Sequence, residues 1–256
     1  MNHSRLKFSI RSLLASIAVI ALLLAVGIRF GRHTIWLTTS GQRPTIQTIP
    51  ATLLIAEPLE EETRSLNIGP IVFELPASMC QTFAVQRPGN GSINLHFTDN
   101  TRTAIVNLTP MHNVTMFALT DFPNKAEPTD LRLYREIASV RSNDFSFGMT
   151  AEELRWHKWL ITNRTLIPAV ESIEYVETPD LEANLLRFSP TAYNFEWGTT
   201  NGEWKGAVTF IDPTGDPAWI RLAASTFELR GDPSVFLKAT DAELGALVAS
   251  SRDDDP

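Results

Sequence analysis

Tryptophan is the residue type in this chain whose spacing best suits recognition. Five of the six Trp fall between residues 156 and 219. A Trp side chain offers a large contact area at little entropic cost, so an exposed row could stack on sugar rings or on a partner protein. The candidate partner or ligand surface comprises Trp156, Trp159, Trp204 and Trp219. The alternative is core packing, which the alternation of Tyr193, Phe195 and Trp197 favours.

Nucleophilic catalysis has no recognisable motif in this sequence. No Ser lies in a Gly-x-Ser-x-Gly turn, and the one Ser-x-x-Lys begins at Ser4, before any folded part. Cys80 could pair with His96 or His112, but nothing in the sequence brings these side chains together. A small buried thiol is the better expectation for Cys80. We therefore predict no catalytic residues and a protein that is not an enzyme.

Metal ligands are equally sparse. None of the five His forms a His-x-x-x-His pair, and zinc needs three or four converging ligands. His96 and Asp99 run from the polar face of a strand into a turn. Asp212 and Asp216 could supply oxygens to calcium, but the stretch lacks the alternating ligands of a calcium loop. The sequence predicts no metal and no cofactor-binding residues.

Scattered carboxylates leave one enzymatic alternative open. Glu196 and Glu203 flank a predicted hairpin, and glycoside hydrolysis needs two carboxyl groups about 5–10 Å apart in a cleft. Glu196 lies on the polar face of its strand, where a solvated role is the simpler interpretation.

The net charge divides the chain into two unlike parts. The whole chain carries −7, and its first 33 residues carry five Lys or Arg and no acid, which leaves −12 for the remainder. So acidic a body repels phosphates, which argues against a nucleic-acid partner.

Residues 12–28 form a run of 17 without a charge, close to the lower limit for a membrane-spanning helix. The run is long for the apolar region of a cleaved signal peptide, and Val26-Gly27-Ile28-Arg29 makes a poor cleavage site. We therefore expect a basic N-terminus and transmembrane signal anchor over 1–33 that contacts the bilayer through residues 12–28. Basic residues nearly balance across the span, and the N-terminal amine favours a cytoplasmic N-terminus. The prediction is a single-pass inner-membrane protein whose C-terminal domain is extracytoplasmic.

The segment Arg5-Leu-Lys-Phe-Ser-Ile-Arg-Ser-Leu-Leu14 carries a resemblance. It resembles the opening of uncharacterised single-span envelope proteins of bacteria. The resemblance covers residues 5–14 and implies an inner-membrane protein, with no activity attached.

Strand and helix patterns must position any site. Residues 34–69 read as a juxtamembrane linker, residues 70–252 as an extracytoplasmic α+β domain, and residues 253–256 as an acidic tail. Alternating residues predict antiparallel strands within 71–120 and 170–224, including a strand over 218–224. A helix is expected over about 131–141, because Asp130 could cap it and Leu131, Tyr134, Ile137 and Ala138 are spaced for one face. Helices are also expected over about 151–163 and after Thr240, because Thr150-Ala-Glu-Glu153 and Thr240-Asp-Ala-Glu243 are capping boxes. The predicted fold class is α+β: an N-terminal transmembrane helix, then antiparallel sheets with packed helices.

The domain could consist of two related halves, 70–142 and 150–252, since each reads as strands followed by a helix. The second half resembles the fold group of the photosystem oxygen-evolving extrinsic proteins. Its basis is the adjacent predicted strands 203–212 and 218–225 with an Asp-Pro-x-Gly turn between them. That resemblance implies a non-enzymatic scaffold.

These observations favour a non-catalytic interaction or assembly domain on a membrane-anchored envelope protein. Its protein partner would bind a strand edge or a surface bearing Trp. The alternatives are an envelope hydrolase that uses scattered carboxylates and a Trp-based module that binds sugars or peptides.

Overall fold

The computed structural model of the 256-residue chain describes residues 14–27, 48–56, 58–68, 70–88, 92–110, 130–140, 149–164, 170–200, 204–231, 235 and 238–250. The chain forms two compact units. The first consists of residues 1–47 and 142–159, and the second of residues 48–141 and 160–256.

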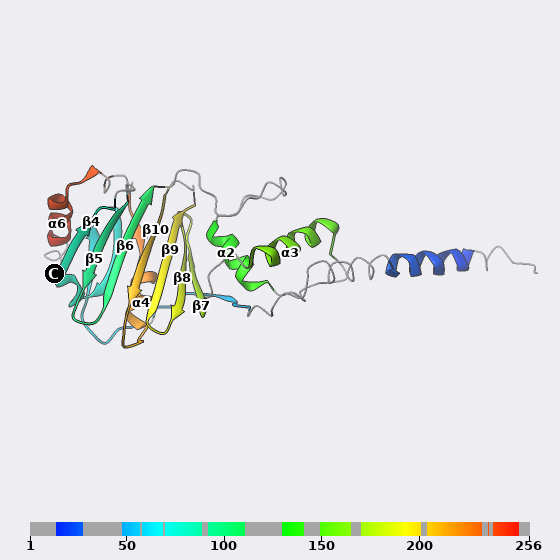
Figure 1. Cartoon of the computed structure of the whole chain (residues 1–256), viewed down its shortest axis with the longest axis horizontal. Helices are drawn as coiled ribbons and strands as arrows, with labels where there is room; N and C mark the ends of the chain where they lie inside the picture. The colour runs from blue at the N-terminus through cyan, green and yellow to red at the C-terminus, as the bar shows by residue number, and fades with distance from the viewer. Residues whose placement is uncertain are drawn as a thin grey trace, which may run out of the picture. The chain divides into compact units, whose positions relative to one another are not determined.

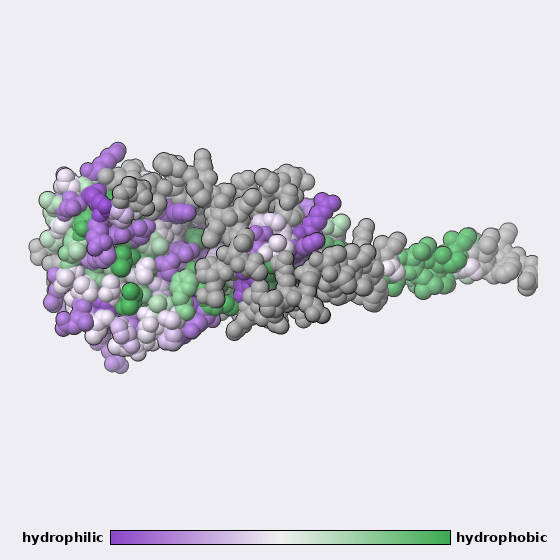
Figure 2. Space-filling model, in the orientation of Figure 1, coloured by the Kyte–Doolittle hydropathy of each residue, from purple (hydrophilic) through white to green (hydrophobic). Residues whose placement is uncertain are grey.

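The first unit contains a helix over residues 14–27 and most of α3 (Ala151–Asn163). Thr150 and Glu153 form the predicted capping box: the Glu153 N–H donates to Thr150 Oγ1 at 3.2 Å, and the Thr150 N–H donates to Glu153 Oε2 at 2.6 Å. The large apolar side chains of helix 14–27 are exposed, and they form the green surface of that helix in Figure 2.

None of the helices in the described part of the chain is both long enough and apolar enough to cross a membrane. The predicted transmembrane signal anchor over 12–28 is therefore wrong. So is the single-pass inner-membrane location with a cytoplasmic N-terminus and an extracytoplasmic C-terminal domain. The expectation that residues 12–28 contact the bilayer stays a prediction.

The second unit contains a large sheet of eight strands in the order β1-β7-β8-β9-β10-β6-β5-β4 (Figure 1). Its strands are β1 (Ala51–Leu53), β4 (Thr82–Gln86), β5 (Ile93–Thr98), β6 (Thr103–Pro110), β7 (Ser172–Glu177), β8 (Leu181–Ser189), β9 (Ala192–Thr199) and β10 (Trp204–Ile211). All neighbours pair antiparallel except β1, which pairs parallel with β7. The sheet is therefore mixed, which corrects the expectation of purely antiparallel sheets. The two predicted halves share this sheet, because β10 pairs with β6.

A smaller sheet and the helices complete the second unit. The small sheet has the order β11-β3-β2, with β2 (Thr63–Ile68), β3 (Ile71–Pro76) and β11 (Glu228–Leu229). The helical elements are the 3₁₀ turn η1 (Met79–Gln81), α2 (Asp130–Ser139), α4 (Ala218–Ser225) and α6 (Asp241–Ser250). Figure 1 shows α4 behind the large sheet, α2 beyond its β7 end and α6 beside β4. Strands β1 and β2 lie within the stretch 34–69 that was expected to be a linker.

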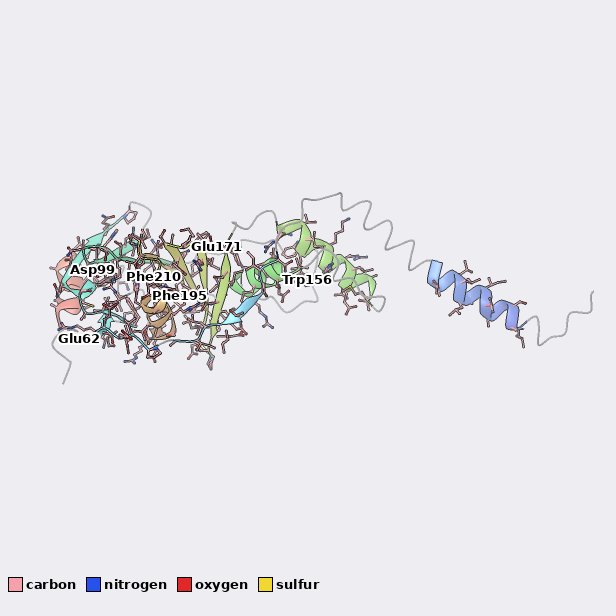
Figure 3. The ribbon with its side chains drawn as sticks, turned by 90° about the horizontal axis from the view of Figure 1, so that it is seen from below. Glu62, Asp99, Trp156, Glu171, Phe195 and Phe210 are labelled. Carbon is pink, nitrogen blue, oxygen red and sulfur yellow. The ribbon has the colours of Figure 1, made fainter. Side chains whose placement is uncertain are left out.

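Strand alternation explains where the core lies. Tyr193, Phe195 and Trp197 of β9 are buried against the small sheet and α4, whereas Asn194 and Glu196 point to the opposite, outer face. Figure 3 labels Phe195 and Phe210 in this core. Trp197 lies over Gly206 of the neighbouring strand. A Cβ at Gly206 would clash with the Trp197 ring and would lie 2.7 Å from Asn107 O, so the glycine makes room for the indole.

The strand predicted over 218–224 is the helix α4. Its buried residues Trp219, Ile220, Ala223 and Ala224 have helical spacing, and the Asp216 side chain accepts the N–H of Ala218 at 3.0 Å. A short apolar run does not reveal its period, which is why the sequence misled. The strand pair on which the photosystem resemblance rested is therefore a strand followed by a helix. The end of the predicted strand region 71–120, from residue 111 on, lies outside the described residues.

Candidate functional site

The candidate Trp surface is divided by the fold. Trp219 is 1% exposed, because its indole lies edge-on to Phe210, with ring centroids 5.4 Å apart, and its Nε1–H donates to Asp212 Oδ2 at 2.5 Å. It is a core residue and offers nothing to a partner. Trp204, in the same unit, is half-buried and packs against that core.

Trp156 and Trp159 belong to the first unit. They are three residues apart on α3, and their rings stack at 5.1 Å between centroids with 7° between planes. Trp156 is buried and Trp159 is half-buried; Figure 3 labels Trp156 on its helix. One face of each ring is therefore covered by the other ring.

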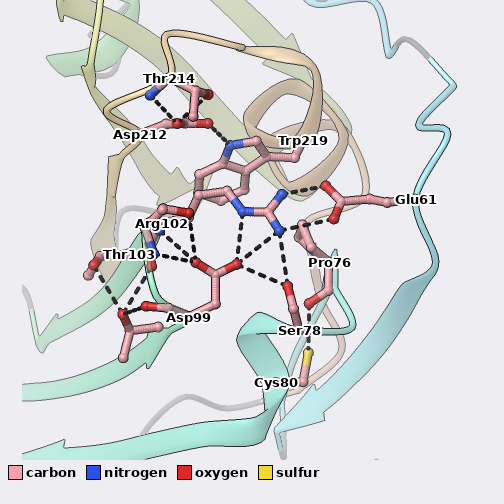
Figure 4. A network of polar contacts seen from close by, with 12 residues as sticks. Glu61, Pro76, Ser78, Cys80, Asp99, Arg102, Thr103, Asp212, Thr214 and Trp219 are labelled. Carbon is pink, nitrogen blue, oxygen red and sulfur yellow. Dashed lines mark hydrogen bonds and ion pairs between the residues drawn. The ribbon is translucent and has the colours of Figure 1, made fainter.

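The most densely bonded polar group surrounds Arg102 (Figure 4). The Arg102 guanidinium donates to both carboxylate oxygens of Glu61, to Asp99 Oδ2 at 3.0 Å and to Ser78 Oγ at 3.0 Å. Asp99 also accepts from Ser78 Oγ at 3.0 Å and from the backbone N–H groups of Arg102 at 2.7 Å and Thr101 at 2.9 Å. We call Glu61, Ser78, Asp99 and Arg102 the Arg102 cluster.

The electrostatics of the Arg102 cluster follow from these bonds. Burial by itself raises the pKa of Asp99, but the hydrogen bonds from Arg102, Thr101 and Ser78 outweigh it and hold the pKa far below its ordinary value of 3.8. The bonds to Glu61 and Asp99 raise the pKa of Arg102. The cluster joins the β5–β6 turn to η1 and to the chain before β2, so its geometry is that of a structural clamp. Sequence reasoning took the Asp99 stretch as a turn and missed Glu61 as its partner.

A second polar group lies where α2 covers the outer face of the large sheet. Tyr175, Asn184 and Glu196 are direct cross-strand neighbours on β7, β8 and β9. Tyr134 and Arg135 of α2 lie over this row. We call Tyr134, Arg135, Tyr175, Asn184 and Glu196 the α2 layer.

Contacts hold the α2 layer together, but some of its polar atoms are open, which means that they have no hydrogen-bond partner among the described residues. Asn184 Nδ2 donates to Leu131 O of α2 at 3.0 Å, and the Arg135 guanidinium lies 4.6 Å from the centroid of the Tyr175 ring. Within the described residues, the Tyr134 hydroxyl, Asn184 Oδ1 and Arg135 Nη1 are buried without a hydrogen-bond partner. Burial of a polar atom without a partner is costly, so such atoms need an explanation.

The ionisable groups of the α2 layer are also perturbed. Burial raises the pKa of Glu196, although Asn194 Nδ2 donates to its Oε1 at 3.0 Å. Burial and the nearby Glu196 carboxylate raise the pKa of Tyr134 to about 12. Perturbed groups gathered in one place are typical of functional sites, and also of structural networks. The solvated role expected for Glu196 is thus replaced by a half-buried one.

The free edge of β1 is a third candidate. Leu53 and Ile55 are 61% and 70% exposed, although both are large and apolar. β1 lies at one end of the large sheet, and no other described strand pairs with its outer edge.

The remaining sequence candidates do not converge. Cys80 is buried as expected, and its thiol donates to Pro76 O at 3.6 Å. The Asp212 carboxylate accepts hydrogen bonds from Trp219 and Thr214, so both of its oxygens already have partners within the chain. Among the residues that the structure describes, no group of three or more His, Cys, Asp or Glu could hold a metal. His112 and Glu203 lie outside those residues.

Comparisons with known proteins add little. No family model matches the chain, and no curated protein matches it. A 1.50 Å crystal structure from Bacteroides thetaiotaomicron is similar to this chain with a TM-score of 0.28 and 11% sequence identity. The match covers 68% of this chain and 50% of that one, so this chain spans half the length of that structure. A likeness this weak carries no argument about fold or function.

Proposed function

We propose that the second unit is a non-catalytic interaction domain that binds an extended segment of a partner protein along the free edge of β1. The observation that carries this proposal is the exposure of Leu53 and Ile55 on an edge strand. An edge strand presents unpaired backbone groups, and exposed apolar side chains beside them give an added strand something to pack against. Residues 34–256 carry −12, which favours a protein over a nucleic acid.

The backbone of β1 is oriented for strand addition. The Leu54 N–H donates to Tyr175 O at 2.9 Å, so Leu54 faces β7. Because successive residues of a strand direct their backbone groups to opposite sides, the N–H groups of Leu53 and Ile55 face away from β7. A partner strand would therefore find donors and apolar side chains on the same two residues.

The opposite end of the sheet supports this assignment by contrast. There α6 packs beside β4, and Arg87, the residue after β4, binds Asp241 of α6 with 2.8 Å between Nε and Oδ1. Proteins commonly cover or charge a sheet edge to prevent unwanted pairing. The β4 edge is covered and charged in this way, whereas Leu53 and Ile55 are exposed at the β1 edge.

Photo-crosslinking in cells tests the proposal with the full chain. A photoreactive residue is placed at Leu53 in one variant and at Val235 in another, since Val235 is 52% exposed and lies away from β1 in the sequence. We expect a discrete protein adduct from position 53 and none from position 235. Equal adducts from both positions, or none from position 53, would contradict the proposal. An adduct of twice the chain's mass would identify a second copy and would overturn the assignment to a different partner.

A proline variant separates strand addition from simple apolar contact. The photoreactive residue moves to Ile55, and Leu53→Pro is compared with Leu53→Ala. Both variants lose the side chain, but only proline removes the outward N–H, and proline is tolerated at such a position of an edge strand. We expect the adduct to persist, weakened, in Leu53→Ala and to vanish in Leu53→Pro. Equal adduct yields in the two variants would rule out pairing through the backbone.

A further inference from the structure

The α2 layer contains open hydrogen-bonding groups that are deeply buried. Tyr134 is 3% exposed and Asn184 is fully buried at 0%. Neither the Tyr134 hydroxyl nor Asn184 Oδ1 has a partner in the part of the chain that the structure describes. Leaving a buried donor or acceptor unpaired costs about 1–3 kcal/mol for each group. A fold that keeps such groups in one layer gains from any molecule that pairs with them.

These groups lie where α2 packs on the outer face of β8 and β9. Asn184 Nδ2 reaches Leu131 O, so the Asn184 amide lies between the sheet and α2. The Tyr134 hydroxyl is close enough to Glu196 for the carboxylate to affect its pKa. Asn184 and Glu196 are cross-strand neighbours, whose Cβ atoms lie about 5 Å apart. The open acceptor of Asn184, the Glu196 carboxylate and the Tyr134 hydroxyl therefore belong to one layer, where α2 packs on the outer face of β8 and β9.

The kind of open group defines the chemistry that would fit. Tyr134 offers a donor and Asn184 Oδ1 an acceptor, so one bridging group must accept and donate at once. A hydroxyl does both. A second hydroxyl on a neighbouring carbon could pair with Glu196 or with Arg135 Nη1, which is also open among the described residues.

Charge argues for an uncharged ligand. Arg135 Nη2 lies 3.7 Å from a Glu177 oxygen and 3.9 Å from a Glu182 oxygen, so its charge is already opposed. Arg164 Nη1 donates to Ile137 O of α2 at 3.4 Å, and the positive charge of Lys205 acts on the Glu196 carboxylate. With both signs present, neither an anion nor a cation finds a net attraction.

We infer that the α2 layer is a binding site for a small uncharged ligand that carries neighbouring hydroxyl groups, as polyols and sugars do. Tyr134 and Asn184 bridge one hydroxyl, and Glu196 and Arg135 receive the next. This site is distinct from the β1 edge, and its occupancy does not depend on strand addition there.

Ligand-observed saturation-transfer NMR on the full chain tests the inference. The probes are myo-inositol, glycerol and D-glucose, with inorganic phosphate and ammonium as charged comparators. Tyr134→Phe removes the open hydroxyl, and Tyr193→Phe is the matched control because Tyr193 is a buried tyrosine on the opposite face of the same sheet. We expect transfer to at least one neutral probe with wild type and with Tyr193→Phe, and affinity about tenfold weaker with Tyr134→Phe.

Several outcomes would overturn the inference. Transfer to phosphate or ammonium alone would show the wrong ligand class, and the absence of transfer to every neutral probe would show no site. Equal affinity in wild type and Tyr134→Phe would place the ligand elsewhere. The free energy of unfolding gives a second readout without ligand. We expect it to stay the same or rise in Tyr134→Phe, because an unpaired hydroxyl is removed; a fall would show that the hydroxyl is already satisfied by water.

Discussion

The Arg102 cluster and the α2 layer are both polar groups set against the same large sheet, yet they are completed in opposite ways. In the Arg102 cluster, Asp99 and Arg102 have several partners each, all supplied by the chain. In the α2 layer, Tyr134 and Asn184 are more deeply buried, yet each keeps an open atom among the described residues. Burial therefore does not distinguish structural from binding polar groups. The two groups differ instead in how far the chain saturates their hydrogen bonds.

The largest effect is expected from removing the centre of the saturated group. Arg102→Met leaves Glu61, Asp99 and Ser78 without their shared donor, so the free energy of unfolding falls by about 3 kcal/mol. Urea denaturation measures this change. Arg230→Met is the matched control, because the Arg230–Glu228 ion pair is exposed and such pairs contribute at most about 1 kcal/mol. If both substitutions cost the same, the clamp has no special role.

Acid should weaken the Arg102 cluster next. Because the pKa of Asp99 is lower in the folded chain than its ordinary value of 3.8, the unfolded chain binds the proton more readily at low pH. The contribution of Asp99 is complete above about pH 5 and is lost as pH falls through 3.8 and below. Asp99→Asn should cost about 2 kcal/mol at pH 7, and the gap to wild type should narrow as pH falls. A gap that stays constant with pH would refute the role assigned to the carboxylate.

Removing an open group should cost much less. Asn184→Leu sacrifices the bond to Leu131 O but also removes an unpaired buried oxygen, so we expect a loss of about 1 kcal/mol or less. Thermal unfolding of Asn184→Leu beside Arg102→Met makes the comparison direct. A loss from Asn184→Leu as large as that from Arg102→Met would mean that burial determines how much a polar group contributes to stability, and that the saturation of its hydrogen bonds does not.

Glu196 should respond to pH in the opposite sense from Asp99, with the smallest effect. Its pKa is raised in the folded chain, so the folded state holds the proton more tightly and stability falls as pH rises past the ordinary value of 4.5. Glu196→Gln cannot ionise. At neutral pH the free energy of unfolding of the variant should therefore exceed that of wild type by less than about 1 kcal/mol. This difference should disappear below pH 4.5. Chemical denaturation at several pH values checks both the sign and the window.

Local signals in the sequence were sufficient for the parts of the fold that depend on neighbours along the chain. The box at Thr240 is formed as predicted, with the Glu243 N–H bonded to Thr240 Oγ1 at 3.3 Å. The predicted face of the helix after Asp130 is also confirmed, since Tyr134, Ile137 and Ala138 are buried. Both patterns require only residues one turn apart.

Long-range contacts were beyond the reach of these patterns. No local sequence pattern indicates that β1 pairs parallel with β7, or that Arg102 binds Glu61, which lies 41 residues away in the chain. Asn184 alternates outward on its strand as a solvated residue would, and only the placement of α2 over it reveals its burial. The one available signal was that α2 offers both Tyr134 and Arg135 on or beside its apolar face.

The pairing of β1 with β7 has a consequence for how the chain is made. Ala51 pairs with Ile173, so about 120 residues must be synthesised before β1 has a neighbour. At about 10 residues per second this is roughly ten seconds, whereas a hairpin forms within microseconds. Leu53 and Ile55 emerge from the ribosome during that interval with no sheet to join. The strand that offers its edge to a partner thus also offers an extended apolar segment to chaperones that act during translation.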